Sequence, residues 1–443
     1  MVSLPTPHAN PLFNYISYCK ILDYNKILSC VRTKLLNNFH TFVRDWNDVN
    51  LKWNKHCFRI PFRSIESDRA SQIELIKPFE IIISREIHKL LFNNYSIIKT
   101  LDINFAQEIN FFQIYLHVNI HDAFKKLTVL YCETRNDSSL FYILASYCHL
   151  LRSIHIRKCQ SDNPGLANLI DVQHNLTSIE CMIDNNDAIF MNQQVLVEIG
   201  NALIKKVNTI THLKVSYQLR FFLPLKLLAD TKNLKVLELT NRINYPDRRL
   251  DILSSKKFSQ LEVLTMGKVN IQLVIQLIEN TEGKLSEVVL DTTYHERYSG
   301  HYIQTVCRYC PNIKVLSLGI NTNDFDNFDN LLINCQKLQK IIIDRYQKPN
   351  LKDTKKLYDI LLKSSPKILC EIRIASNWVF LASDLDKFIV DWNARIPPVP
   401  LTMYLSIFIK SDETFNVSMK MLEQHEKDGT LKHYDFFCDN YIC

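Results

Sequence analysis

The chain has 443 residues, of which 47% are hydrophobic and 22% are charged. This composition excludes a disordered chain, because it supplies enough apolar surface to bury a core. The formal net charge is only +7 and no block of like charges occurs, which argues against a dedicated nucleic-acid-binding protein.

The start of the chain and its cysteines suggest a cellular location. Pro5, Pro7 and Pro11 lie where a secretory signal would carry its apolar region. No uncharged run reaches the roughly 18 residues that a membrane span needs. The 13 cysteines are an odd number, which does not suit a full set of disulfides. We therefore expect reduced thiols, no membrane partner, and a location in the cytoplasm, the nucleus or both.

Residues 1–69 predict a helical N-terminal segment that is rich in aromatic and basic residues. Residues 1–95 hold 13 basic and 8 acidic side chains, so +5 of the net charge lies there. We interpret this mild bias as a solvated surface. The next part of the chain opens with a predicted helix whose apolar positions are Ile73, Ile76, Ile82, Ile87 and Leu91.

One pattern then occurs eleven times: an apolar residue, two variable residues, an apolar residue, one variable residue and an apolar residue. Successive copies begin 24 to 34 residues apart, and most of these spacings lie at or just beyond the upper end of the range of leucine-rich repeats, about 20–29 residues. The last positions alternate between apolar and variable residues, which predicts a short strand with one buried face. The copies are Ile98-Leu101-Ile103, Leu127-Leu130-Cys132, Leu151-Ile154-Ile156, Leu176-Ile179-Cys181, Ile210-Leu213-Val215, Leu234-Leu237-Leu239, Leu261-Leu264-Met266, Leu285-Val288-Leu290, Ile313-Leu316-Leu318, Leu338-Ile341-Ile343 and Leu369-Ile372-Ile374.

Helical patterns lie between these predicted strands. Strands this short bury a core only when neighbouring units stack, so the alternation predicts an α/β leucine-rich-repeat solenoid of about 11 repeats. In this horseshoe a parallel sheet lines the concave side and helices cover the convex side. The predicted helices include Ser139–Tyr147, Gln193–Lys206, Ile271–Asn280, Tyr302–Cys310 and Lys355–Lys363.

The predicted organisation has three parts. Residues 1–69 form the N-terminal segment, residues 70–380 form the solenoid, and residues 381–443 form a last repeat and cap. The cap contains a helix over Leu385–Trp392, a strand over Leu401–Ile407, and a final helix and strand. Terminal units of a solenoid normally cover its exposed core in this way.

Two cysteines, Cys307 and Cys310, have the C-x-x-C spacing of half a zinc site. However, Cys148, Cys310 and Cys335 each lie three residues before the first apolar residue of a repeat, where a helix returns to a strand. Equivalent positions are separated by whole repeats, which does not suit a tetrahedral site. We therefore predict structural cysteines and no bound metal.

Motifs for catalysis and for cofactors are missing. The chain has only 7 glycines and neither type of glycine-rich phosphate loop. His117 and His121 could share a helix face, but they lack a third ligand. Tyr294–Tyr298 follows a predicted strand, and we interpret it as an exposed polar loop. The sequence therefore predicts a protein that is not an enzyme and has no cofactor.

The stretch Ala145–Cys159 resembles the cysteine-containing, ribonuclease-inhibitor-like class of leucine-rich repeats found in F-box proteins. Cys310–Leu318 and Asn334–Ile343 repeat the same theme. The chain is similar to a large fungal expansion of these proteins. In that expansion a segment like Pro11–Cys19 follows the F-box, and a segment like Asp428–Phe436 lies near the end.

This resemblance implies a substrate receptor of a Skp1–cullin–F-box ubiquitin ligase, which marks proteins for degradation. The N-terminal segment would hold Skp1 and the solenoid would hold a protein substrate. The chain departs from the family at the F-box, since Leu4-Pro5 is followed by Thr6 and not by an acidic residue, although Trp46 is present. The alternative is a free interaction or inhibitor-type repeat protein with no connection to a ligase.

The variable residue between the last two apolar positions of each repeat is predicted to face the concave surface. The set mixes both charges with aromatic and aliphatic side chains, as protein-binding surfaces do, whereas a groove for a polyanion would be uniformly basic. The alternative for any single residue is that it is merely solvated. The candidate partner-binding residues are Asp102, Tyr131, His155, Glu180, Lys214, Glu238, Thr265, Ser317 and Arg373, and Val289 and Ile342 occupy the same position in their repeats.

Overall fold

The computed structural model describes residues 21–38, 72–73, 75–77, 79, 83, 98–103, 124–182, 196–216, 225–240, 248–267, 269–290, 299–345, 351–374, 378–396, 399–406 and 412–437. Several predicted features lie outside these residues, namely His117, His121, Tyr294–Tyr298 and Trp46. Most of the predicted helix from Ile73 to Leu91 also lies outside them. The chain forms two compact units, Met1–Thr209 and Ile210–Cys443.

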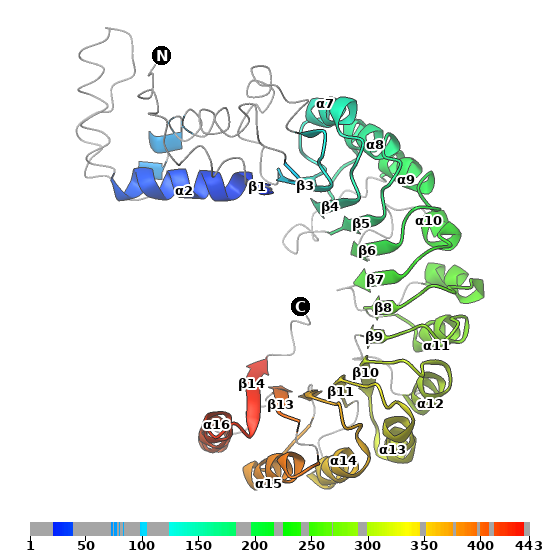
Figure 1. Ribbon diagram of the computed structural model, residues 1–443, viewed down its shortest axis with the longest axis vertical. Helices are drawn as coiled ribbons and strands as arrows, with labels where there is room; N and C mark the ends of the chain where they lie inside the picture. The colour runs from blue at the N-terminus through cyan, green and yellow to red at the C-terminus, as the bar shows by residue number, and fades with distance from the viewer. Residues whose placement is uncertain are drawn as a thin grey trace. The chain divides into compact units, whose positions relative to one another are not determined.

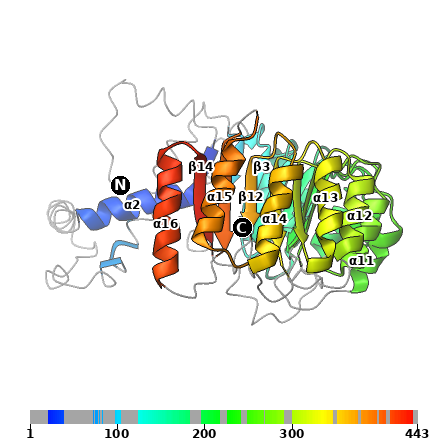
Figure 2. The same ribbon diagram turned by 90° about the horizontal axis from the view of Figure 1, so that it is seen from below.

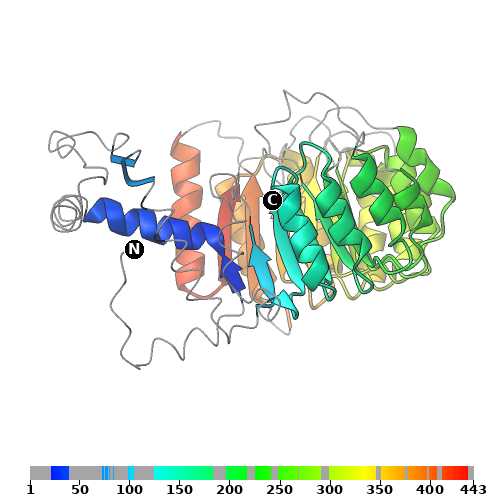
Figure 3. The ribbon, with the colours of Figure 1, turned by 90° about the horizontal axis from the view of Figure 1, so that it is seen from above.

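The first unit, Met1–Thr209, holds five parallel strands in chain order among its described residues. Helices stand side by side on one face of these strands (Figure 3). The elements are β1 (Ile21–Asp23), α2 (Tyr24–Asn37), β2 (Thr100–Asp102), β3 (Val129–Glu133), α7 (Ser138–Tyr147), β4 (Ser153–Lys158), α8 (Pro164–Asp171), β5 (Ser178–Cys181) and α9 (Val197–Ile204).

The second unit, Ile210–Cys443, continues the same alternation over nine described strands, again parallel and in chain order. Within this unit the strands line the inner side of an arc and the helices its outer side (Figure 1). The strands are β6 (His212–Ser216), β7 (Val236–Thr240), β8 (Val263–Met266), β9 (Glu287–Leu290), β10 (Val315–Gly319), β11 (Lys340–Asp344), β12 (Glu371–Ile374), β13 (Leu401–Ser406) and β14 (Leu431–Phe437).

The connections of the second unit are mostly α-helices, and α11 to α16 stand in a row (Figure 2). Between β7 and β8 the described connection is a 3-10 helix, η4 (Arg248–Ser255). The others are α10 (Leu225–Asp230), α11 (Ile271–Glu279), α12 (Ser299–Tyr309), η5 (Thr322–Asp324), α13 (Phe325–Asn334), α14 (Leu351–Ser364), α15 (Ala382–Asn393) and α16 (Asp412–Lys427).

The eleven repeats predicted from the sequence form the eleven strands β2 to β12. Every apolar position of the eleven copies is buried, at most 6% exposed. The first apolar residue of each copy precedes its strand. The other two lie on the buried side of the strand, except that Ile103 directly follows β2. The prediction of an α/β leucine-rich-repeat solenoid is therefore confirmed.

The helices and strands predicted for the last part of the chain are present as α15, β13, α16 and β14. One strand was not predicted. Ile21–Asp23 lies in the segment expected to be helical, and it pairs in parallel with β2, Leu22 opposite Leu101. The segment therefore contributes a strand to the sheet as well as the helix α2. The three-part division of the chain stays a prediction.

Buried asparagines connect neighbouring repeats of the first unit at the carboxyl ends of the strands. Asn136 accepts a hydrogen bond from the amide of Glu133 (2.7 Å) and donates to the carbonyl of Ile103 (3.1 Å). Asn163 donates to the carbonyls of Thr134 (2.9 Å) and Asn136 (2.8 Å). These side chains satisfy backbone groups of the turns that would otherwise be buried without partners.

Candidate functional site on the helix-free face of the strands

Side chains that alternate with the buried ones emerge on the strand face opposite the helices, which we call the helix-free face. In β7 and β12, buried and half-buried residues alternate strictly. The register brings the predicted candidates into rows. In the first unit Asp102 lies opposite Tyr131, Tyr131 opposite His155, and His155 opposite Glu180.

In the second unit Lys214 lies opposite Glu238, and Glu238 opposite Thr265, which in turn lies opposite Val289. A further run places Ser317 opposite Ile342, and Ile342 opposite Arg373. Within each unit these candidates are therefore neighbours across the strands. Their role in binding a partner stays a prediction.

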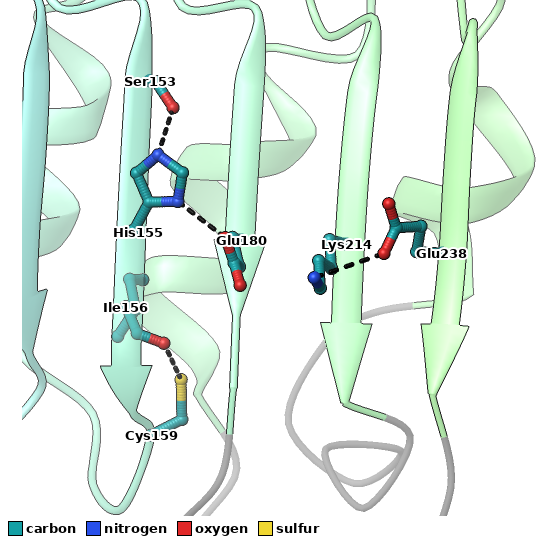
Figure 4. A network of polar contacts seen from close by, with 7 residues as sticks. All are labelled: Ser153, His155, Ile156, Cys159, Glu180, Lys214 and Glu238. Carbon is teal, nitrogen blue, oxygen red and sulfur yellow. Dashed lines mark hydrogen bonds and ion pairs between the residues drawn. The ribbon is translucent and has the colours of Figure 1, made fainter. Parts of the chain in front are cut away.

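His155 is held from three sides. Its Nε2 lies 2.8 Å from Ser153 Oγ, and its Nδ1 lies 2.7 Å from Glu180 Oε2 (Figure 4). Its ring stacks on Tyr131 with centroids 4.3 Å apart and an interplanar angle of 15°. With both ring nitrogens and one face engaged, the imidazole has a fixed orientation.

Arg157 extends this cluster along β4. Its guanidinium carbon lies 4.6 Å from the centre of the Tyr131 ring, and its Nη1 lies 3.5 Å from Asp102 Oδ2. The Arg157 side chain is about half exposed, whereas that of Asp102 is 11% exposed. The cluster therefore presents an aromatic ring and a cation to solvent, above carboxylates that are already engaged.

The chain of contacts from Ser153 through His155 to Glu180 has the order of a catalytic triad. In a triad, a carboxylate orients an imidazole, and the imidazole activates a hydroxyl. Acyl transfer also needs donors aimed at the developing oxyanion. Strand β4 lies between β3 and β5, and the Ser153 amide donates to the carbonyl of Thr128 (3.1 Å). The pairing of β4 with both neighbours therefore engages backbone amides of this strand that could otherwise stabilise an oxyanion.

The second unit carries ion pairs between adjacent strands on the helix-free face. Lys214 Nζ lies 3.3 Å from Glu238 Oε2, on β6 and β7 (Figure 4). Lys340 Nζ lies 2.8 Å from Glu371 Oε1, on β11 and β12. Pairs of partly exposed groups such as these contribute little to stability, about 0–1 kcal/mol each, but they fix the charge pattern that a partner meets.

The row of candidates continues beyond the eleven repeats, which the sequence reasoning did not include. Arg373 lies opposite Tyr404 on β13, and its guanidinium carbon is 4.7 Å from the ring centre. Tyr404 in turn lies opposite Asp435 on β14. The sequence pattern that could have identified Tyr404 is the alternation of Leu401, Met403 and Leu405, which places Tyr404 on the opposite face of the strand. Lys340 and Glu371 were also missed, because they lie on the strand two residues before the predicted row.

Ser317 is buried, 1% exposed, as is Asp102 at 7%, whereas the other candidates are half-buried. The pairing of β10 with β9 ends at Leu316 and Val288. At the next position the Ser317 hydroxyl accepts from the amide of Leu290 and donates to its carbonyl at 3.2 Å. The side chain thus replaces the strand pairing and is turned into the sheet, so it is not available at the helix-free face.

The three cysteines at equivalent repeat positions, Cys148, Cys310 and Cys335, are all buried. Burial raises the pKa of each thiol to about 12. Cys307, the other half of the C-x-x-C pair, is half-buried. Among the described residues no group of three or more histidine, cysteine or acidic side chains could hold a metal ion.

These thiols should resist modification in the folded protein. At pH 8 a thiol of pKa about 12 has roughly one part in 10⁴ as thiolate, the reactive form. We expect Cys148, Cys310 and Cys335 to stay unlabelled by iodoacetamide between pH 7 and 9, while the exposed Cys30 reacts. Mass spectrometry of labelled peptides checks this. Labelling of the three thiols at the rate of Cys30 would contradict their burial. As a control, the same three thiols should be labelled once the protein is unfolded in urea.

In comparisons with known proteins, the sequence matches no protein-family model and no curated protein. Within the described part of the chain, none of the helices has the length and apolar character needed to span a membrane.

Proposed function

We propose that this chain is a non-catalytic protein-binding protein that uses the helix-free face of its parallel strands. The observation that supports the proposal is the arrangement of this face, where tyrosine and arginine side chains are held in place by neighbours across the strands. Tyr131 is contacted by His155 and Arg157, and Tyr404 by Arg373. Orientation in advance of binding lowers the entropy cost of association, and tyrosine and arginine are frequent anchors of protein interfaces.

We further propose, from the resemblance to F-box repeat proteins, that the bound protein is presented to a Skp1–cullin–F-box ubiquitin ligase. The second candidate is a free interaction protein with no ligase. The strand β1 favours this second candidate, because Ile21–Asp23 extends the repeat sheet from within the segment that would otherwise serve the adaptor. Co-purification of the folded full chain with Skp1 decides between the two. Recovery of Skp1 supports the ligase, and a partner complex without Skp1 supports the free protein.

The binding face itself is tested by two matched tyrosines of the first unit. Tyr131 is on β3 in the helix-free face, whereas Tyr142 is on α7 and is 44% exposed. We expect Tyr131→Ala to weaken binding of a co-purified protein partner at least tenfold, as loss of an anchor does, and Tyr142→Ala to leave it unchanged. Titration calorimetry measures both. Equal losses, or a loss only for Tyr142→Ala, would contradict binding on the helix-free face of this unit.

A further inference from the structure

The centre of the helix-free face in the second unit is apolar, in contrast to its two sides. Five aliphatic side chains and one threonine lie half-buried on five consecutive strands, β7 to β11. We call them the central strip. Its members are Val236, Val263, Thr265, Val289, Val315 and Ile342.

The strip is bounded on both sides by charges that already have partners. Lys214 pairs with Glu238 at 3.3 Å on one side, and Lys340 pairs with Glu371 at 2.8 Å on the other. An apolar centre with a polar rim is the usual anatomy of a protein interface. Because the rim is paired internally, it provides no net field that would select a strongly charged partner.

One charged group interrupts the strip. Glu287 on β9 lies opposite Val263 on one side and opposite Val315 on the other. It is half-buried, and none of the side-chain hydrogen bonds and ion pairs of the described residues involves its carboxylate. A carboxylate between two valines is partly desolvated without compensation, so a cation brought by a partner would gain more there than at an open surface.

We propose that the central strip binds a protein segment that carries several apolar side chains and a single lysine or arginine, with the cation placed on Glu287. This inference rests on the proposed protein-binding function and specifies the partner's chemistry. Adjacent strands lie about 4.8 Å apart, so five strands span roughly 19 Å. An extended segment of about six residues covers this length at about 3.3 Å per residue.

The test uses the full chain and random twelve-residue peptides displayed on phage. We expect the enriched peptides to combine apolar or aromatic residues with one basic residue. The affinity of a synthetic copy is then measured by fluorescence anisotropy for the wild type, for Glu287→Gln and for Glu282→Gln, an exposed glutamate outside the strands that serves as the matched control. Glu287→Gln should weaken binding about tenfold and Glu282→Gln should not change it.

Replacing the basic residue of the peptide by methionine should cause the same tenfold loss, and combining it with Glu287→Gln should add little, because both changes remove one interaction. Several results would overturn the proposal: enriched peptides without a basic residue, equal binding to Glu287→Gln, additive losses, or no binding peptide at all. If the peptide still binds Glu287→Gln but no longer binds Tyr404→Ala, it binds the helix-free face outside the central strip, and the proposal for the strip is wrong. Whether the protein binds a partner on its helix-free face at all is tested separately, by the variants Tyr131→Ala and Tyr142→Ala.

Discussion

The variant Gly165→Ala is expected to destabilise the protein by about 2–3 kcal/mol, the upper part of the range for overpacking, because the obstructing atoms cannot move aside. Gly165 lies in the first turn of α8, and a Cβ atom there would be 2.1 Å from the carbonyl oxygen of Ser138 at the start of α7. The obstacle is backbone, which a side-chain rotation cannot remove. Ser138 is also held by the start of α8 itself, since its hydroxyl donates to Asn163 Oδ1 at 3.1 Å.

Urea unfolding followed by circular dichroism measures this loss. Asn168→Ala is the matched control, because Asn168 is exposed on the same helix and alanine has the higher helix propensity. We expect the control to be neutral or slightly stabilising. An unchanged urea midpoint of unfolding for Gly165→Ala would contradict the close approach of α7 and α8 at Gly165.

The second large effect is expected for Asp353→Ala, which should cost about 3–5 kcal/mol because it leaves a buried guanidinium without its carboxylate. The side chains of Arg345 and Asp353 are 2% and 8% exposed, and Arg345 Nη2 donates to Asp353 Oδ2. Thr322 Oγ1 donates to the same oxygen at 3.0 Å. The Arg345 guanidinium also lies over the Trp378 ring, 5.0 Å from its centre.

The same unfolding measurement applies to this pair, with Asp359→Ala as control, because Asp359 is exposed on the same helix, α14. Asp353→Asn retains an acceptor for the Thr322 hydroxyl, so it should lower the free energy of unfolding less than Asp353→Ala does. A change below about 0.5 kcal/mol for Asp353→Ala would show that the pair adds nothing beyond the surrounding hydrophobic core.

The repeats could be predicted from the sequence because the signal is local and recurs. Leu237-Glu238-Leu239 specifies a strand with one buried face within three residues, and ten further copies at a similar spacing specify how the units stack. The strand β1 could not be predicted in this way. Ile21–Asp23 is too short to show a period, and it becomes a strand only because the exposed edge of β2 offers hydrogen-bond partners.

The candidate surface was only partly predictable. The alternation of apolar and variable residues shows that the side chains of His155 and Glu238 lie on the face opposite the buried one. It does not show which side chains they contact on that face. Ser317 has the same place in its repeat as His155, yet it turns into the sheet because the pairing of β9 and β10 ends beside it. The isolation of Glu287 between valines also depends on register, which no single repeat specifies.

The sequence by itself determined the repeat fold and the side of each strand that is buried. The recurrence of the apolar spacing decides the fold, and the spacing within one repeat decides the buried side. Only the tertiary structure decided the contacts between separate elements: the ring of His155 on Tyr131, the approach of Gly165 to Ser138, and the pairing of Arg345 with Asp353. The physical reason is that these contacts join residues whose distance depends on strand register and helix placement. A pattern read along one strand contains neither quantity.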